Sequence, residues 1–449
     1  MDPRAPSRGA RGVHFPTATW KAAMHNEILL LVGTRPEAVK AAPVALALGR
    51  HRRLRPAIIH SGQHRGMVEQ ALAPFGLTPA EVLTVERRAG EQAELVAALL
   101  PALDGVLARR APAALVVQGD TTTTLTGALA AFWRGIPVVH LEAGLRTGDL
   151  AAPFPEEGNR QMVARIASLH LAPTADAAEA LRAEAIPAAS VVVTGNTVVD
   201  AVRHIAAADR PAVNPALACL EADLDAGGGR LVLVTVHRRE SWGAPLTEVL
   251  GAVRTLADRY PEVRVVLPAH PNPAVRRQVG DVLGGHPRIT VTGPLAYPDL
   301  VRVLRRAELV ITDSGGIQEE APSFGVPVLV ARAVTERMEA VRAGCAWLVG
   351  TDRARVLDAA ERVLATGIRV PADQNPFGDG HAARRACAAI DQLLATQPTF
   401  GVPTSRTPAT PRTPSADSTV VGDTPAVRSS STVAVNPARV ASTAVARTQ

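Results

Sequence analysis

The sequence predicts an α/β protein built from two Rossmann-like domains, each with a parallel sheet, and a central cleft between them. The main observation is that short apolar runs alternate with longer helical stretches along residues 27–196. The same alternation restarts after the glycine-rich segment DAGGGR, at residues 225–230. Strands of a parallel sheet are buried on both faces, so they are typically continuous apolar runs. Two such series indicate two domains, at residues 27–196 and 197–379.

In the first domain, each expected strand ends at a turn rich in polar residues or glycine. The strands are EILLLV, PAIIH, ALVVQ, PVVHL, LHLA and VVV, which begin at residues 27, 56, 114, 137, 169 and 191. The segments between them are expected to include a helix after the first strand, a helical stretch to about residue 75, a helix at about 90–109 and a helix that starts in the threonines 121–124.

The second domain repeats the pattern, with strands LVLVTV, VRVVLP, ITVT, LVIT and PVLV from residues 231, 263, 289, 309 and 327. Helices are expected at about 245–260, up to about 306 and up to about 324, and a closing helix at residues 380–396 ends the body. Residues 1–26 and 397–449 are expected to be a disordered leader and tail, because neither has the apolar periodicity of a packed core. Met24, directly before the first strand, is an alternative start.

Composition excludes several classes of protein. Residues 1–26 and residues 397–449 each carry a net charge of +3, which together equal the formal +6 of the chain, so the body between them is formally neutral. Nucleic-acid binding is therefore not expected. No apolar run is long enough to span a membrane. The three cysteines have no CxxC or Cys/His spacing, so no disulfide framework or zinc site is expected, and a cytoplasmic location follows as the default.

Lysine is nearly absent from the chain. Of its 48 basic residues, Lys21 and Lys40 are the only lysines. Arginine carries a planar fork and lysine a compact charge on a thin stem, so a site that needs the second cannot use the first. Lys40, the one lysine of the body, is therefore a candidate functional residue.

Acidic side chains follow two of the expected strands. Asp120 ends ALVVQGD, Glu142 ends the run at residues 136–141, and Glu156 and Glu157 follow in the loop after it. The carboxyl ends of parallel strands are where α/β sheets bind ligands. Two alternatives remain: an acidic surface loop, and an Asp120 that only caps the helix begun by its threonines.

The turn GTRPEAVK, after the first strand, has the residues of an anion site. Thr34 and Glu37 have the spacing of a capping box, and Arg35 and Lys40 flank a helix amino terminus. The alternative is that Glu37 and Lys40 simply pair with each other along the helix.

A matching turn in the second domain is LVITDSGGIQEE. Ser314 can cap the helix there, Gly315 and Gly316 let a phosphate approach its amides, and Glu320 can reach sugar hydroxyls. His237 lies at another strand end beside Arg238 and Arg239, where it either meets an anion or is a buried hydrogen-bonding residue.

The chain resembles the non-hydrolysing UDP-N-acetylglucosamine 2-epimerases over about residues 27–396. The resemblance rests on motifs that occur in this order: GTRPEAVK, SGQHR, GDTTTT, HLEAGLRTGD, PFPEEGNR, TGNTVVDA, HRRES, AHPNP, TDSGGIQEEAPSFGVPVLV, TERMEA and NPFGDG. It implies a glycosyltransferase-B-like pair of domains, usually a homodimer, that interconverts UDP-N-acetylglucosamine and UDP-N-acetylmannosamine without NAD or metal. Met338 and Ala333 depart from the proline and aspartate common in the family, in one loop.

The resemblance also implies roles for individual residues. The carboxylates that act on the sugar are Asp120, Glu142 and Glu156, and Lys40 and His237 are grouped with them as catalytic. The diphosphate is held by Arg35, Lys40, His237 and Arg337 with the amides of Ser314, Gly315 and Gly316, the ribose by Glu320, and the uracil near Leu295 and Leu300. Many bacterial relatives bind a second UDP-N-acetylglucosamine as an allosteric activator, and Gln63, Arg238 and His270 match residues of that site.

The chemistry implied is elimination of UDP to 2-acetamidoglucal, followed by re-addition with protonation on the other face of C2. Three alternatives stay open at this point: an epimerase of a related UDP-sugar such as a 2,3-diacetamido uronate, a UDP-sugar glycosyltransferase on the same fold, and a UDP-sugar-binding module without turnover.

Overall fold

The computed structural model of the chain describes residues 26–64, 66–86, 90–238, 241–371 and 374–396. Within these residues, strands form a seven-stranded and a six-stranded sheet, and all neighbouring strands are parallel. The predicted α/β class with two parallel sheets is thereby confirmed. The expected disordered leader, apart from Asn26, and the expected disordered tail lie outside the described residues. No helix in the described ranges is long and apolar enough to cross a membrane.

The first lobe contains the seven-stranded sheet in the order β3-β2-β1-β4-β5-β6-β7. Its strands are β1 (Glu27–Val32), β2 (Arg55–His60), β3 (Glu81–Val82), β4 (Ala114–Gln118), β5 (Val138–Leu141), β6 (Leu169–Ala172) and β7 (Val191–Val193). The order reverses between β1 and β4, and α/β sheets bind ligands outside the carboxyl ends of the strands at such a reversal. Of these strands, only the short edge strand β3 was not predicted.

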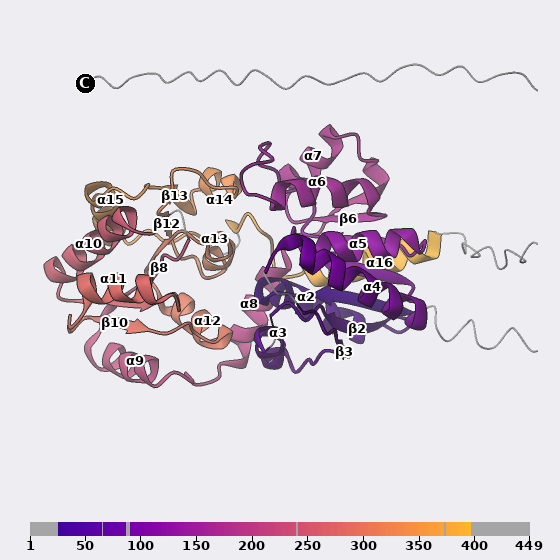
Figure 1. The fold of residues 1–449 in the computed structure, drawn as a ribbon. Coiled ribbons are helices and arrows are strands. Elements are labelled where there is room, and N and C mark those ends of the chain that lie inside the picture. The colour runs from indigo at the N-terminus through magenta and orange to yellow at the C-terminus, as the bar shows by residue number, and fades with distance from the viewer. Residues whose placement is uncertain (1–25, 65, 87–89, 239–240, 372–373, 397–449) are drawn as a thin grey trace, which may run out of the picture. The chain divides into compact units, whose positions relative to one another are not determined.

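The helices of the first lobe cover both faces of this sheet (Figure 1). Alternate residues of β1 pack into two different cores, Leu30 on the side of α2 and Leu31 on the side of α4 and α5. The helices are α2 (Arg35–Gly49), α3 (Met67–Leu72), α4 (Gln92–Arg110), α5 (Thr122–Trp133), α6 (Glu156–Ile166) and α7 (Ala175–Ala183). Glu156 and Glu157 were expected in a loop. They form the first turn of α6 instead, because the two prolines before them end the loop.

The second lobe repeats the arrangement with the order β10-β9-β8-β11-β12-β13, reversed between β8 and β11. Its strands are β8 (Arg230–Thr235), β9 (Val263–Pro268), β10 (Ile289–Thr292), β11 (Leu309–Thr312), β12 (Val328–Val330) and β13 (Ala346–Leu348). Its helices are α9 (Pro215–Gly227), α10 (Ala244–Arg259), α11 (Pro273–Leu283), α12 (Tyr297–Arg306), α13 (Gly315–Glu320), α14 (Met338–Arg342) and α15 (Arg353–Thr366).

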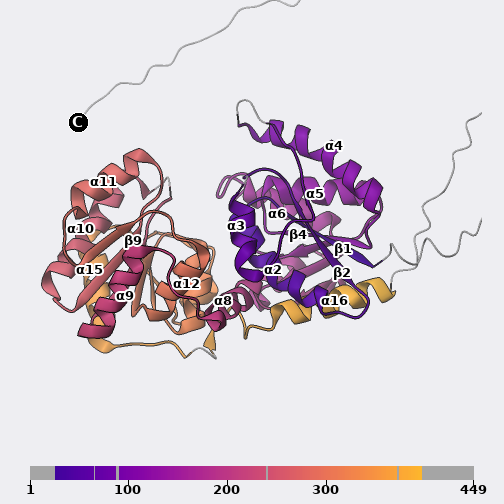
Figure 2. The ribbon, with the colours of Figure 1, turned by 90° about the horizontal axis from the view of Figure 1, so that it is seen from below.

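One helix joins the lobes, and a second follows the return of the chain to the first lobe. The first, α8 (Thr197–Ala208), contacts α2 in the first lobe and α12 and α13 in the second. The second, α16 (Ala382–Thr396), returns to the first lobe and lies along α2 and α8, as Figure 1 and Figure 2 show in yellow. Asp200 on α8 accepts hydrogen bonds from the amides of Ala382 and Ala383, at 3.1 and 3.0 Å. The closing helix is therefore part of the first lobe.

Candidate active site

A cavity of about 810 Å³ lies between the carboxyl ends of the two sheets and is lined by both lobes. Its lining includes fourteen of the sixteen candidate residues: Arg35, Lys40, Asp120, Glu142, His237, Arg238, His270, Leu295, Leu300, Ser314, Gly315, Gly316, Glu320 and Arg337. Glu156 and Gln63 are not in the lining. Glu156 is half-buried at the start of α6, and Gln63 accepts a hydrogen bond from Thr123 at 2.9 Å.

The first wall of the cavity is the turn between β1 and α2. The capping box is confirmed: the Thr34 hydroxyl accepts from the Glu37 amide, and the Glu37 carboxylate accepts from the amides of Gly33 and Thr34 at 2.6 and 2.7 Å. A Cβ at Gly33 would lie 2.4 Å from the Ser61 hydroxyl and 2.7 Å from that of Thr123, so any larger residue would have to displace these buried side chains. Burial raises the pKa of Glu37, whose hydrogen bonds oppose that rise.

Four ionic groups from both lobes, three of them buried and Arg337 partly buried, meet on one side of the cavity. We name them the interlobe cluster: Lys40, Glu142, Glu319 and Arg337. The Lys40 Nζ lies 2.6 Å from Glu142 Oε1 and 2.8 Å from Glu319 Oε2. Arg337 lies 2.9 Å from Glu319 and 3.8 Å from Glu142. The alternative that Lys40 pairs with Glu37 is therefore wrong. Gln118 donates a further hydrogen bond to Glu142.

Charges within the interlobe cluster offset part of the cost of burial. Burial alone would lower the pKa of Lys40. The carboxylates of Glu142 and Glu319 raise this pKa by more than burial lowers it, so the pKa of Lys40 lies above its usual value. The pKa of Glu319 is lowered, because Lys40 and Arg337 together outweigh its burial. Burial and the charge of Glu319 raise the pKa of Glu142. Glu319 was not predicted from the sequence. Its position next to Glu320 was the available signal, because neighbouring residues of a helix point about 100° apart. Only one of the two glutamates can therefore face a given ligand, and the other must have different partners.

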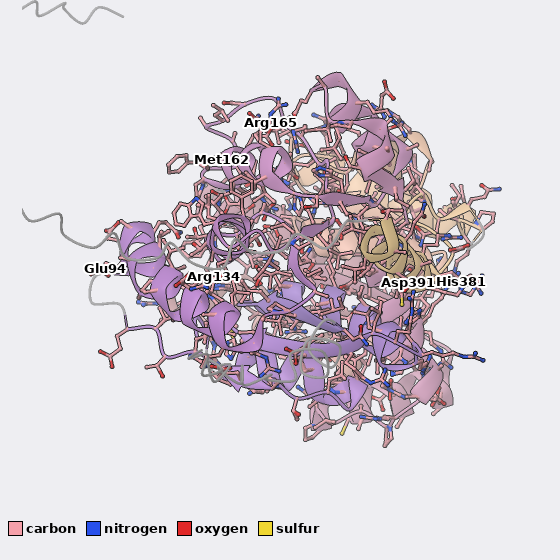
Figure 3. The ribbon with its side chains drawn as sticks, turned by 90° about the vertical axis from the view of Figure 1, so that its right-hand side faces the viewer. Glu94, Arg134, Met162, Arg165, His381 and Asp391 are labelled. Atoms are coloured by element: carbon pink, nitrogen blue, oxygen red, sulfur yellow. The ribbon has the colours of Figure 1, made fainter. Side chains whose placement is uncertain are left out.

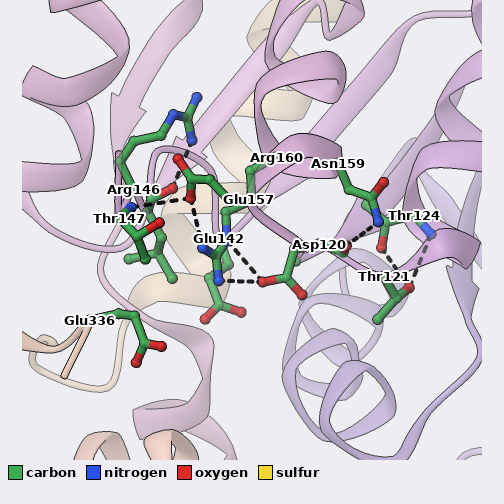
Figure 4. A network of polar contacts seen from close by, with 12 residues as sticks. Asp120, Thr121, Thr124, Glu142, Arg146, Thr147, Glu157, Asn159, Arg160 and Glu336 are labelled. Carbon is green, nitrogen blue, oxygen red and sulfur yellow. Dashed lines mark hydrogen bonds and ion pairs between the residues drawn. The ribbon is translucent and has the colours of Figure 1, made fainter. Parts of the chain in front are cut away.

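A second set of ionic groups, which we name the acid network, consists of Asp120, Glu157 and Arg160 (Figure 4). The Nε and NH2 atoms of Arg160 lie 2.9 and 2.6 Å from Asp120 Oδ2, and its NH1 lies 3.0 Å from Glu157 Oε2. Asp120 does not cap α5, as one alternative supposed. Thr121 does, because its hydroxyl accepts from the Thr124 amide at 3.2 Å.

Glu157 was expected only as the second acid of the pair after Glu142, with no role of its own, and Arg160 was not among the candidate residues. Their signal in the sequence is the i, i+3 spacing of opposite charges in EEGNR, which aligns two side chains on one helix face. Helix α6 places this face against the turn that carries Asp120.

The turns of the second lobe form the opposite wall. The buried carboxylate of Asp313 accepts from the amides of His237 at 2.9 Å and Arg238 at 2.9 Å, and so joins the ends of β8 and β11. Ser314 is the residue before α13, but its side chain makes no capping hydrogen bond. The rings of His237 and His270 stack at 6.5 Å. Arg239, the other arginine expected there, lies outside the described residues.

Glu320 and Tyr297 are buried at the far end of this wall. Burial raises the pKa of Glu320 to about 7, with Arg35 opposing and Glu319 adding to the shift. Burial, with the charge of Glu320, raises the pKa of Tyr297. The Arg35 guanidinium lies 5.9 Å above the Tyr297 ring and donates to the Leu295 carbonyl at 3.0 Å. The Tyr297 hydroxyl and the Glu320 carboxylate face each other and interact, so Tyr297 partly satisfies this buried acid.

In the part of the chain that the structure describes, no group of three or more His, Cys, Asp or Glu side chains is arranged to hold a metal ion. The three cysteines are free thiols, Cys345 and Cys387 buried and Cys219 exposed. A neighbouring cavity of about 730 Å³ shares Arg238 with the first, and Arg146, Glu336 and Arg342 are among its other lining residues.

Comparison with known proteins gives one consistent result. A family model described as UDP-N-acetylglucosamine 2-epimerase matches residues 46–391. A UDP-N-acetylglucosamine 2-epimerase of Yersinia pestis is 41% identical over 369 residues, which are 81% of this chain and 98% of the relative.

Solved structures agree with the sequence relatives. The epimerase from Neisseria meningitidis, solved with UDP-N-acetylglucosamine bound, has a TM-score of 0.73 and 35% identity, and covers 82% of this chain and 100% of its own. The Staphylococcus aureus MnaA–UDP co-structure has a TM-score of 0.74 and 39% identity, over 82% and 97% of the two chains. The expected glycosyltransferase-B-like architecture is thus confirmed. The chain belongs to the UDP-N-acetylglucosamine 2-epimerase family.

Proposed function

We propose that this protein is an isomerase that interconverts UDP-N-acetylglucosamine and UDP-N-acetylmannosamine by inverting C2 of the sugar. The observation that carries the proposal is that one cavity combines the acids Asp120 and Glu142 with the cations Arg35, Lys40 and Arg337. The cations suit a diphosphate, and the acids suit proton transfer at the attached sugar.

The order of bond changes follows from the chemistry of the substrate. The C2 hydrogen beside an acetamido group is barely acidic, so direct abstraction is unfavourable. Cleavage of the C1–O bond first makes an electron-poor sugar whose C2 proton can be removed, which gives UDP and 2-acetamidoglucal. UDP then adds back to C1 while C2 is protonated on the opposite face. The enzyme must therefore stabilise the departing diphosphate and supply acid or base groups to two faces of C2.

The proposed roles follow this division. Arg35, Lys40, His237 and Arg337, with the amides of Ser314, Gly315 and Gly316, bind the diphosphate, Glu320 binds the ribose, and Leu295 and Leu300 flank the uracil. Lys40 and His237 also belong to the catalytic set, with Asp120, Glu142 and Glu156. Glu156 lies outside the cavity lining, so its role requires its carboxylate to approach the sugar when substrate binds.

The test is to incubate the protein with UDP-N-acetylglucosamine in heavy water and to follow the proton NMR spectrum. We expect deuterium at C2 and a second, manno-configured nucleotide sugar. In Asp120→Asn, we expect both to be lost while UDP still binds. Absence of exchange in the wild type would contradict the proposal. Exchange only with a UDP-2,3-diacetamido uronate would reassign the substrate, and sugar transfer to an added acceptor without exchange would indicate a glycosyltransferase.

A homodimer is part of the proposal. It is supported by large apolar side chains exposed on the neighbouring helices α5 and α6: Phe132 and Trp133 are 52% and 65% exposed, and Met162 is 49% exposed. Figure 3 shows Met162 and Arg134, the residue after Trp133, on the face turned to the viewer. We expect a dimer in light scattering and a monomer for Trp133→Glu. A monomeric wild type would contradict this.

Activation by a second UDP-N-acetylglucosamine is also proposed. Arg238 and His270 line the cavity, whereas Gln63 does not. If activation occurs, pure UDP-N-acetylmannosamine should react with a lag that a trace of UDP-N-acetylglucosamine removes. A rate without a lag would exclude activation.

A further inference from the structure

We propose that Arg160 is a positioning residue for the reaction: it fixes the Asp120 carboxylate and, through Glu157, the loop that follows Glu142. This inference rests on the proposed function, because it assigns a task to a residue that lies behind the acids of that site. Arg160 is not in the lining of the cavity.

The contacts of Arg160 fix which oxygen of Asp120 is available. Both Nε and NH2 of Arg160 contact the same carboxylate oxygen, Oδ2, at 2.9 and 2.6 Å. Oδ1 makes no hydrogen bond with any described residue, and Asp120 lines the cavity. The neighbouring Asn159 donates to the main-chain carbonyl of Asp120 at 2.8 Å. Helix α6 therefore holds both the side chain and the backbone of Asp120, and leaves Oδ1 for the substrate.

The remaining nitrogen of Arg160 connects this contact to the second acid-bearing segment. NH1 lies 3.0 Å from Glu157 Oε2, and the same oxygen accepts from the Thr147 amide at 3.1 Å. The other oxygen of Glu157 accepts from the Gly148 amide at 3.4 Å and from Gln161 at 3.1 Å. The loop fixed in this way begins directly after Glu142. One guanidinium thus links the turn of Asp120 to the loop of Glu142 (Figure 4).

Because Arg160 is buried, its contacts with Asp120 and Glu157 depend on whether residue 160 is an arginine or a lysine. The Arg160 side chain is 6% exposed and that of Glu157 is fully buried. A buried charge is stable only when its partners are in place, so loss of one contact affects the others. The planar guanidinium reaches two carboxylates in a fixed geometry, whereas a lysine at this position would contact only one of them closely.

The inference predicts a defect in turnover and none in nucleotide binding. For Arg160→Lys, we expect kcat for epimerisation to fall about 100-fold, the scale of a catalytic group misplaced by about 1 Å. KM and the Kd of UDP, measured by calorimetry, should change less than about threefold, because Arg160 contacts no residue proposed to bind the diphosphate. Arg165→Lys is the matched control: Arg165 lies exposed on the same helix and donates to the carbonyl of Glu184, and its replacement should leave kcat unchanged.

Chemical rescue separates positioning from a general contribution to folding. In Arg160→Ala, added guanidinium ion should restore kcat at least about tenfold, and methylammonium at the same concentration should restore little, because only guanidinium reproduces the forked contacts. If Arg160→Ala does not fold, Glu157→Gln replaces it. That variant keeps the helix and the shape of the side chain but removes its charge, so it weakens the contacts of residue 157 with Arg160 and with the loop, and its kcat should fall about tenfold with an unchanged Kd for UDP.

The outcomes are distinct. If the wild type shows no exchange at C2, the proposed function fails and this inference with it. If the wild type is active and Arg160→Lys keeps its kcat, this inference alone is overturned. It is overturned as well if kcat falls only in parallel with a weakened affinity for UDP, or if methylammonium rescues as well as guanidinium does.

Discussion

The acid network and the interlobe cluster are both largely buried sets of carboxylates and cations, but they are built differently. The acid network lies within the first lobe, and its Glu157 and Arg160 are three residues apart on one helix. The interlobe cluster takes Lys40 and Glu142 from one lobe and Glu319 and Arg337 from the other. The first can form as soon as the first lobe folds, whereas the second requires the lobes to meet. The acid network thus sets local geometry, and the cluster couples the lobes beside the cavity.

The largest effect is expected for Lys40→Arg, which tests the cluster. The guanidinium is too broad for a buried position between two carboxylates at 2.6 and 2.8 Å, although its charge is the same. We expect kcat to fall 10²- to 10³-fold, about 3 to 4 kcal/mol in the activation barrier. Arg53→Lys, at an exposed ion pair, serves as the control. Normal turnover in Lys40→Arg would contradict the argument from lysine scarcity.

Glu319→Gln should distinguish the interlobe cluster from the acid network most clearly, because it changes the charge of the cluster alone. It leaves Lys40 with Glu142 alone and Arg337 with only the more distant carboxylates of Glu336 at 3.6 Å and Glu142 at 3.8 Å, so the free energy of unfolding should drop by about 3 kcal/mol in urea denaturation. An anionic ligand can replace the lost charge, so UDP should raise the melting temperature of this variant more than that of the wild type. An equal or smaller rise would show that Glu319 does not neutralise the cations.

Glu320→Gln tests a buried acid for which the nearby cations Arg35 and Lys40 do not outweigh burial. Its pKa is raised to about 7 by burial, so the folded chain keeps the proton between about pH 4.5 and 7 while the unfolded chain releases it. The wild type should therefore lose stability as the pH rises through this window, on the order of 2 to 3 kcal/mol, and the variant should not.

The comparison in that experiment is between the two proteins at each pH. Buried His140 and His170, each with a pKa lowered to about 4 by burial, give the opposite trend in both proteins and cancel in the difference. A difference between the two proteins that does not change from pH 4.5 to pH 8 would contradict the raised pKa of Glu320.

The smallest effect is expected for Asp358→Asn, which breaks an exposed pair with Arg362 on α15. Because both side chains are more than 60% exposed, solvent screens their attraction. The free energy of unfolding should change by less than about 0.5 kcal/mol, and kcat should not change. A larger loss would mean that ion pairs contribute to this fold irrespective of burial.

The sequence predicts well those features that depend on neighbouring residues. The run EILLLV indicates β1, and the spacing of Thr34 and Glu37 indicates the capping box. Both features are predictable because the burial of a strand and the cap of a helix depend on residues only a few positions apart in the sequence. The acids Asp120 and Glu142 were expected in one cleft because parallel strands end at one edge of a sheet. Both line the cavity.

Features that depend on distant contacts were not predicted. The pairing of Lys40 with Glu319 joins residues 279 positions apart, and no local pattern encodes which of Glu319 and Glu320 meets it. The position of Glu156 outside the cavity lining could not be predicted either, because it depends on how α6 packs. The part played by Arg160 could have been suspected from EEGNR, but its partner Asp120 lies 40 residues earlier in the chain.

The return of α16 to the first lobe has a consequence for synthesis on the ribosome. The surfaces of α2 and α8 that α16 covers stay exposed until residues 382–396 leave the exit tunnel, after the whole second lobe has been made. The first lobe, which is translated first, therefore completes its folding last. Until then, the apolar surface of α2 and α8 that α16 later covers must be kept from aggregating with other chains.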